Sequence, residues 1–307
     1  MNIKKIILTL LILILIGGGL YFFFTRNKET APVSNDTTDT TEVTKPEDVM
    51  EQKPYTVIGQ SVEQRPIEAY RFGTGEKTIV YVGAMHGGYE WNSALLSYDL
   101  IDYLTANPTR IPENVSVVVI PVANPDGLAR VVGTSERFEA TDAPQFNFAD
   151  EVSIDDPVVA GRFNAHKVDL NRNFACKWQP RAVWRSYDVN AGTAAFSEPE
   201  SAALRDFFLA ENPVGVIFFH SASNGVYTSF CGDDPLPGTV QLLDAYSKAS
   251  GYTRYDDYPY YEVTGDAADW LSTEGIPAIT IELATHTAVE WDKNLKGFEA
   301  VLKLYSK

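Results

Sequence analysis

The sequence predicts an α/β fold in which helices cover both faces of a sheet. From Pro54 onward, apolar strand-like runs alternate with segments of helical periodicity. Hydrophobic residues make up 45% of the 307 residues, which is enough for a large core in one domain. The net charge of −16 and the lack of a basic stripe argue against binding to nucleic acid.

Four apolar runs predict buried strands, because they are continuous and rich in β-branched or aromatic residues. The second run ends in the turn signal Asn124-Pro125-Asp126-Gly127. The predicted strands are 78–84, 115–122, 214–219 and 278–283.

Three segments predict helices. The first carries apolar residues at helical spacing and ends at Asn107-Pro108. The second follows Ser197-Glu198-Pro199-Glu200, a pattern typical of a capping box. The third is ended by Gly275. The predicted helices are 91–106, 201–210 and 266–273.

The first 26 residues predict a membrane anchor. An uncharged apolar run from Ile6 to Phe24 is flanked by lysines and by Arg26, and such a helix is long enough to cross a bilayer. We therefore expect a signal anchor at residues 1–26 that holds the rest of the chain outside the cytoplasm. The alternative is a signal peptide cleaved after Gly17-Gly18-Gly19, which would release a secreted protein.

Residues 27–53 are rich in Thr, Asp, Glu and Pro and contain almost no large apolar residue, so we expect a flexible, disordered linker before a single domain at 54–307. The chain has two cysteines, Cys176 and Cys231. Outside the cytoplasm one disulfide between them is expected, and two buried thiols are the alternative.

Three residues with catalytic chemistry lie at or just past the C-terminal ends of predicted strands: His86, His220 and Glu282. Open α/β sheets bind ligands at that edge, so these side chains can converge on one crevice. Glu282 lies in an otherwise apolar strand, and burying its carboxylate requires a partner such as a metal-bound water or an arginine.

The motif His86-Gly87-Gly88-Tyr89-Glu90 places an imidazole and a carboxylate within five residues. Taken alone, such a pair is more often a surface pair than a metal site. His-Gly-Gly after a strand also resembles the oxyanion loop of α/β-hydrolases, but the chain has no Gly-x-Ser-x-Gly motif.

A polar block surrounds Asp169, Asn171 and Arg172. Arg172 offers a planar fork for a carboxylate, Asn171 adds a donor, and Asp169 could orient a metal-bound histidine. The simpler interpretation is a loop with an Asx turn. Two histidines and a glutamate for a metal, with a separate carboxylate as base, form the inventory of a hydrolytic zinc site.

The order of these motifs resembles the zinc carboxypeptidase family of carboxypeptidase A-like metallopeptidases, from about Tyr55 to the C-terminus. The resemblance implies an α/β/α sandwich around a mixed eight-stranded sheet and one Zn²⁺ per chain. It is carried by His86 with Glu90-Trp91, Asn124 to Gly127, Asp169 to Phe174, Ser197 to Glu200, His220-Ser221, Tyr261 to Trp270 and Glu282-Leu283.

The resemblance also implies roles for individual residues. His86, Glu90 and His220 resemble the zinc ligands, Asp169 the partner of the first histidine, and Glu282 the general base that takes a proton from a zinc-activated water. Asn171 and Arg172 resemble the pair that binds the terminal carboxylate of the substrate. Tyr261 resembles the mobile tyrosine that closes over the bound peptide. Arg162, with Arg137 as the alternative, resembles the arginine that polarises the scissile carbonyl.

The chain departs from the family pattern at two positions. Three residues separate His86 from Glu90 where two are usual, and Lys167 stands where Gly is frequent. The family match also places Asp266 against the pocket for the C-terminal side chain, with Ala268 at its floor. Asp266 would then favour Lys, Arg or diaminopimelate, and the simpler interpretation is that it caps the following helix.

The function that follows is a zinc metallocarboxypeptidase that hydrolyses the C-terminal residues of peptides with a free carboxylate. One alternative is a cell-wall peptidase or amidase of the same fold that acts on muropeptides, and a further one is an amidase that de-acylates small N-acyl amino acids. Another is a surface binding module without catalytic activity.

Overall fold

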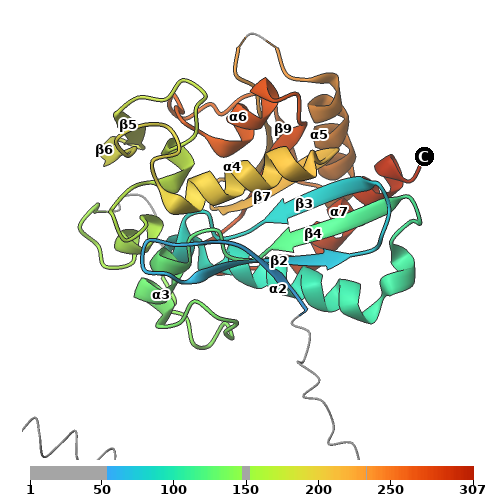
Figure 1. The fold of residues 1–307 in the computed structure, drawn as a ribbon, viewed down its shortest axis with the longest axis horizontal. Coiled ribbons are helices and arrows are strands. Elements are labelled where there is room, and N and C mark those ends of the chain that lie inside the picture. The colour runs from blue at the N-terminus through green and yellow to red at the C-terminus, as the bar shows by residue number, and fades with distance from the viewer. Residues whose placement is uncertain (1–53, 147–152, 233) are drawn as a thin grey trace, which may run out of the picture. The chain divides into compact units, whose positions relative to one another are not determined.

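The computed structural model describes residues 54–146, 153–232 and 234–307, and its centre is a mixed sheet of eight strands (Figure 1). The strand order is β1-β2-β4-β3-β7-β10-β8-β9, so the predicted mixed α/β fold is confirmed. The strands are β1 (Thr56–Gln60), β2 (Pro66–Phe72), β3 (Lys77–Val82), β4 (Val115–Ile120), β7 (Gly215–Ser221), β8 (Gly225–Thr228), β9 (Thr253–Tyr255) and β10 (Ala278–Leu283).

The four strands predicted from apolar runs form the parallel centre of this sheet, β4-β3-β7-β10. They are buried on both faces, which explains why their sequences are continuously apolar rather than alternating. Ile79 and Tyr81 of β3 contact one core, whereas Val80 and Val82 contact the other. A separate hairpin consists of β5 (Arg181–Trp184) and β6 (Tyr187–Asn190).

Helices cover both faces of the sheet, and Figure 1 shows α4 and α6 in front of it and α2 and α7 behind it. The core behind the sheet contains apolar residues of α2, α5 and α7, and the core in front contains those of α4 and α6. The helices are α2 (Trp91–Ala106), α3 (Pro125–Val132), α4 (Pro199–Glu211), α5 (Pro237–Ser250), α6 (Ala267–Thr273) and α7 (Trp291–Tyr305).

The predicted capping box before α4 is wrong, although the helix is present. Glu198 occupies the N-cap and makes no side-chain cap. Ser197 Oγ donates instead to Glu198 Oε1, 2.9 Å away, and the Glu200 carboxylate accepts from the backbone of Val62 and from Asn164. Pro199 has no N–H and a φ already suited to a helix, so the first turn forms without the box.

The predicted anchor at 1–26 and linker at 27–53 lie outside the described residues. Among the helices within 54–146, 153–232 and 234–307, none has both the length and the apolar character needed to cross a bilayer.

Candidate metal centre and catalytic cavity

The edge of the sheet where β3, β7 and β10 end carries the predicted catalytic residues. His220 and Glu282 are direct neighbours in register on the parallel strands β7 and β10. His86 follows β3 after a short turn. His220 and Glu282 follow His86 by 134 and 196 positions in the sequence, and the parallel strands bring all three to one sheet edge, as the sequence predicted.

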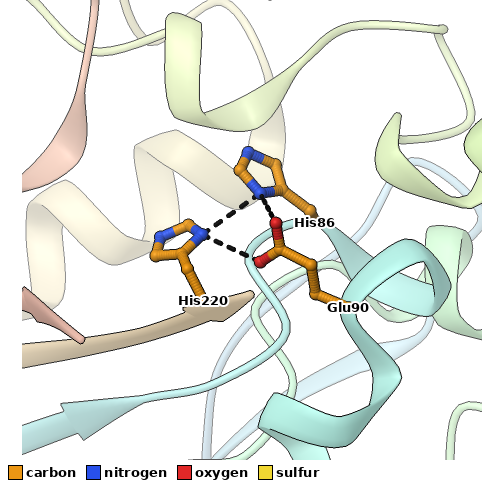
Figure 2. Close-up of side chains that lie close together, drawn as sticks. All are labelled: His86, Glu90 and His220. Atoms are coloured by element: carbon orange, nitrogen blue, oxygen red, sulfur yellow. Dashed lines mark hydrogen bonds and ion pairs between the residues drawn. The ribbon is translucent and has the colours of Figure 1, made fainter. Parts of the chain in front are cut away.

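His86, Glu90 and His220 form a tight buried cluster, and Figure 2 shows both imidazoles turning Nδ1 toward the Glu90 carboxylate. Glu90 Oε1 lies 2.8 Å from His86 Nδ1, and Glu90 Oε2 lies 2.9 Å from His220 Nδ1. The two Nδ1 atoms are 3.1 Å apart. Burial would by itself raise the pKa of Glu90, but the two histidines outweigh it and lower that pKa.

These atoms fit a single metal ion. Nitrogen ligands about 2.0–2.1 Å from a tetrahedral ion lie roughly 3.3 Å from each other, close to the observed separations. Without an ion, the lone pairs of the two Nδ1 atoms would point at each other and repel. A metal ion between them would accept both lone pairs. Two imidazoles, one carboxylate and a fourth position open to solvent are the ligand set of a catalytic zinc site.

The three-residue spacing between His86 and Glu90 is accommodated by a 3₁₀ turn at Gly87–Glu90. Gly87 has a φ of +44°, and a Cβ there would lie 2.7 Å from the backbone of Gly127 and from Gly161 O. Only glycine combines that left-handed backbone with so close an approach. The extra residue is therefore absorbed before the helix begins, and Glu90 still reaches the cluster.

Asp169 and Arg162 support the first histidine from behind. Asp169 Oδ1 lies 3.3 Å from His86 Nε2, a long contact that leaves this nitrogen without a well-aligned hydrogen bond. Arg162 Nε donates to Asp169 Oδ2 at 2.8 Å, and Arg162 Nη1 lies 3.9 Å from Glu90 Oε1. Burial opposes ionisation of Asp169, but Arg162 and His86 lower its pKa, so it stays an anion.

Glu282 lines the cavity beside the cluster. Its Oε2 accepts a hydrogen bond from the backbone N–H of Ser223 at 3.1 Å. Burial and the negative charge of Glu90 raise the pKa of Glu282 to about 8. A bound dication would act in the opposite direction, because it favours the charged carboxylate.

The family follows from comparison with known proteins. The family model for zinc carboxypeptidases matches residues 47–298, which is more than half of the chain. The chain belongs to the zinc carboxypeptidase family. His86, Glu90 and His220 form a group compatible with the family's metal.

Two similar proteins are the gamma-D-glutamyl-L-diamino acid endopeptidase 1 of Lysinibacillus sphaericus, 28% identical over 253 residues, and carboxypeptidase B of Astacus astacus, 27% identical over 249 residues. The alignments cover 76% and 74% of this chain. They cover 61% of the first relative and 77% of the second, so this chain spans less than two thirds of the endopeptidase.

Solved structures share the fold. Thrombin activatable fibrinolysis inhibitor has a TM-score of 0.59 and 20% identity, over 81% of this chain and 67% of that chain. The murein-tripeptide amidase MpaA from Escherichia coli O157 has a TM-score of 0.55 and 20% identity, over 82% of this chain and 92% of that chain.

In this member of the zinc carboxypeptidase family, Asn171, Arg172 and Asp266 line the same cavity as the metal cluster. Asn171 is held on both sides of its amide, because Nδ2 donates to Asp266 Oδ2 at 2.7 Å and Oδ1 accepts from the N–H of Ala267. Arg172 donates from Nε to the carbonyl of Val183 and from Nη1 to that of Asn171. Both residues are therefore fixed in place.

Asp266 caps α6, and it also lines the cavity. Its Oδ1 accepts from the N–H of Asp269 at 2.9 Å, as the simpler sequence interpretation held. The predicted floor residue Ala268 packs in the core in front of the sheet, and Asp269 lines the cavity instead. Gly265 lets this segment approach the backbone of Arg172, since a Cβ there would lie 2.1 Å from Arg172 O.

Other predicted residues are placed as follows. Tyr261 lines the cavity, and its ring centroid is 6.0 Å from Cζ of Arg172. Arg137 lies away from the cavity, where it pairs with Asp102 and stacks on Tyr98. Lys167 adopts a φ of +60°, so it keeps the left-handed backbone that glycine would take there.

Cys176 and Cys231 are joined by a disulfide, with their Cα atoms 5.8 Å apart. The Cys176 carbonyl accepts from the N–H of Gly265, and the Cys231 N–H donates to Ser272 Oγ of α6. The bridge therefore links two loops that both contact the segment beneath the substrate cavity.

Sequence reasoning missed several cavity residues, among them Arg185, Tyr258, Asp269 and His286. Arg185 is an exposed residue in a short hairpin, and Tyr258 lies in a loop without periodicity. Of these residues, only Tyr258 has a signal in the sequence, because it belongs to a run rich in tyrosine just before Tyr261.

Proposed function

We propose that this zinc metallopeptidase removes residues from the C-terminal end of peptides that carry a free carboxylate. One observation carries the proposal: a single cavity contains the His-Glu-His cluster, the separate carboxylate of Glu282 and the guanidinium of Arg172. A base beside a metal performs hydrolysis, and a buried arginine beyond it selects substrates that end close to the scissile bond.

Zinc, when bound by His86, Glu90 and His220, supplies Lewis-acid activation of water and of a carbonyl group. Glu282 accepts the proton of the attacking water and returns it to the leaving nitrogen as the C–N bond breaks. The Ser223 N–H holds the Glu282 carboxylate in place at 3.1 Å, so the base is oriented before the substrate arrives.

Two arginines and a tyrosine complete the proposed machinery. Arg162 places a permanent positive charge beside Glu90, where it can stabilise negative charge on the substrate carbonyl oxygen. Arg172 binds the terminal carboxylate, and Asn171 fixes the neighbouring Asp266. Tyr261 lies against Arg172 and would close over the bound residue.

A cell-wall substrate is the second candidate. Its support is the similarity to a gamma-D-glutamyl-L-diamino acid endopeptidase and the shared fold with a murein-tripeptide amidase. Besides Glu90 and Glu282, the cavity is lined by Asp266 and Asp269, and these two acidic side chains suit a basic group in either case. Lys or Arg would provide it in a peptide, and the free amine of diaminopimelate would provide it in a muropeptide.

We also propose that the catalytic domain works outside the cytoplasm, attached to the membrane by residues 1–26. The apolar run flanked by lysines and the disulfide between Cys176 and Cys231 support this location. Protease treatment of intact cells should digest the catalytic domain, whereas protection until the cells are lysed would contradict the location.

The reaction is tested with zinc-loaded protein, a panel of peptides and muropeptides, and product masses. Glu282→Gln should keep zinc and lose about 10²–10⁴-fold in kcat, because only the proton transfer is removed. Glu113→Gln, an exposed substitution with the same change in charge, is the control. His220→Ala should lose the metal itself, as measured by elemental analysis. Normal turnover in zinc-loaded Glu282→Gln would refute the mechanism.

A further inference from the structure

A second cavity opens beside the catalytic one and has a volume of about 450 Å³. The two cavities share five wall residues, so they are continuous: Arg185, Ala222, Ser223, Tyr258 and Tyr261. The remaining wall residues of the second cavity are Asn224 and Tyr260.

The second cavity lies on the side of the scissile bond opposite the C-terminal residue. None of Asn171, Arg172 and Asp266 contributes to it, although all three line the catalytic cavity. Ser223 contributes to both, and its N–H binds the proposed base Glu282. A peptide whose terminal carboxylate lies at Arg172 would therefore direct its preceding residues past Glu282 into the second cavity.

The chemistry of this cavity favours an anion. Arg185 is its only cationic wall residue among those the structure describes, and no carboxylate lines it. Within that part of the chain no ion pair joins Arg185 to an acidic side chain, and its Cζ lies 5.5 Å from the centroid of the Trp184 ring. Hydroxyl groups of Ser223 and the tyrosines, and the amide of Asn224, add further donors.

The backbone at Arg185 indicates that the side chain matters at this position. Trp184 and Tyr187 pair across the hairpin, so Arg185 and Ser186 form a two-residue turn. Arg185 has a φ of +55° and Ser186 does not have a positive φ, a combination that favours glycine at the first position. An arginine here costs backbone strain, and strained residues gather at functional sites.

We propose that this cavity is a subsite for a carboxylate on one of the two residues that precede the scissile bond, with Arg185 as its cationic ligand. The chain has a net charge of −16, so its overall field does not attract acidic groups. An arginine without an acidic partner would therefore attract an acidic group locally and specifically. This inference rests on the proposed peptidase function, and it adds a preference for acidic residues on the acyl side.

The test uses matched peptides with one C-terminal residue and either Glu or Gln at the last or the second-last position before the scissile bond. We expect the wild-type kcat/KM to favour Glu over Gln about threefold to tenfold at one of these positions. Arg185→Gln should bring that ratio to about one, and Arg185→Lys should keep part of it. Arg181→Gln, an exposed change in the same hairpin outside both cavities, should keep the wild-type ratio.

Three results would overturn the subsite: no preference for Glu in the wild type at either position, the same ratio in Arg185→Gln, or an equal loss for Glu and Gln peptides. The last result would assign Arg185 to the reacting group. If the wild type cleaves none of the peptides, the proposed function fails separately. Calorimetry then measures the binding of the same peptides to zinc-loaded Glu282→Gln. Tighter binding of the Glu peptides that is lost with Arg185→Gln supports the subsite, whereas equal binding of Glu and Gln peptides refutes it.

Discussion

The substitution Asp169→Asn separates the metal site from the fold in one experiment. Asp169 is fully buried and accepts hydrogen bonds from Arg162 Nε at 2.8 Å and from the N–H of Asn171 at 3.1 Å. It also faces His86 Nε2 at 3.3 Å. Asparagine is almost the same size as aspartate, so the change removes the charge with little change in packing. One carboxylate oxygen is replaced by an NH₂ group, which then faces a donor and cannot accept its hydrogen bond.

The expected loss of stability follows from these contacts. Removing one partner of a buried ion pair costs about 3–5 kcal/mol because the other charge stays buried. Arg162 keeps Glu90 at 3.9 Å and the Trp184 ring at 4.7 Å, so the lower half of that range applies. For a domain of this size, about 3 kcal/mol lowers Tm by roughly 6–12 °C. Zinc affinity should fall about 10–100-fold, since His86 loses the anion behind it.

Two measurements check these values. Thermal or urea unfolding of the metal-free protein gives the loss of stability, and competition with a chelator gives the zinc affinity. Asp102→Asn is the matched control, because it breaks an Asp–Arg pair with Arg137 in which both side chains are about half exposed. Exposed pairs contribute about 0–1 kcal/mol, and this one lies far from the metal ligands.

The proposed role of Asp169 is refuted if Asp169→Asn and Asp102→Asn lose the same stability and bind zinc equally well. A large loss of stability with unchanged zinc affinity would keep Asp169 as a partner of Arg162 alone. A loss of zinc affinity without a loss of stability would show that zinc binding by His86 depends on the negative charge of Asp169. It would also show that the fold does not depend on the ion pair between Asp169 and Arg162.

Three further predictions concern pH, specificity and the disulfide. Burial and Glu90 raise the pKa of Glu282 from 4.5 to about 8, so in chelated protein stability should fall as pH rises through that window, and urea titrations of Glu282→Gln should lack that contribution. Asp266→Asn should lower the ratio of kcat/KM for substrates ending in Lys and Leu about threefold to tenfold, whereas an unchanged ratio would leave Asp266 as a helix cap alone. Replacing Cys176 and Cys231 by serine should cost about 4 kcal/mol of unfolding free energy, because the bridge closes a loop of 55 residues, and two alkylatable thiols in the unreduced native chain would contradict this.

The sequence determined the centre of the fold. Strands buried on both faces have to be continuously apolar, so β3, β4, β7 and β10 could be located within one or two residues. The outer strands β1, β8 and β9 have only five, four and three residues, and no comparable apolar run marks them in the sequence. Hairpin β5–β6 escaped prediction for the same reason.

The sequence also determined which residue types meet at the metal site. Histidines and glutamates are costly to bury without a partner, and His86, His220 and Glu282 occur at or just past the ends of strands that share one sheet edge, with Glu90 four residues after His86. Their order along the chain was enough to indicate the family. The capping box failed because hydrogen-bond partners distant in sequence, such as Val62 and Asn164, competed for Glu200.

Only the tertiary structure decided where single side chains direct their polar atoms. The turn at Gly87 showed that Glu90 reaches the metal cluster despite its longer spacing, because a left-handed glycine absorbs the extra residue. Packing placed Asp269 rather than Ala268 on the cavity wall, and brought Arg185 from a separate hairpin to its rim. Such placements depend on distances of a few ångströms between elements far apart in sequence, and local propensity carries no information about them.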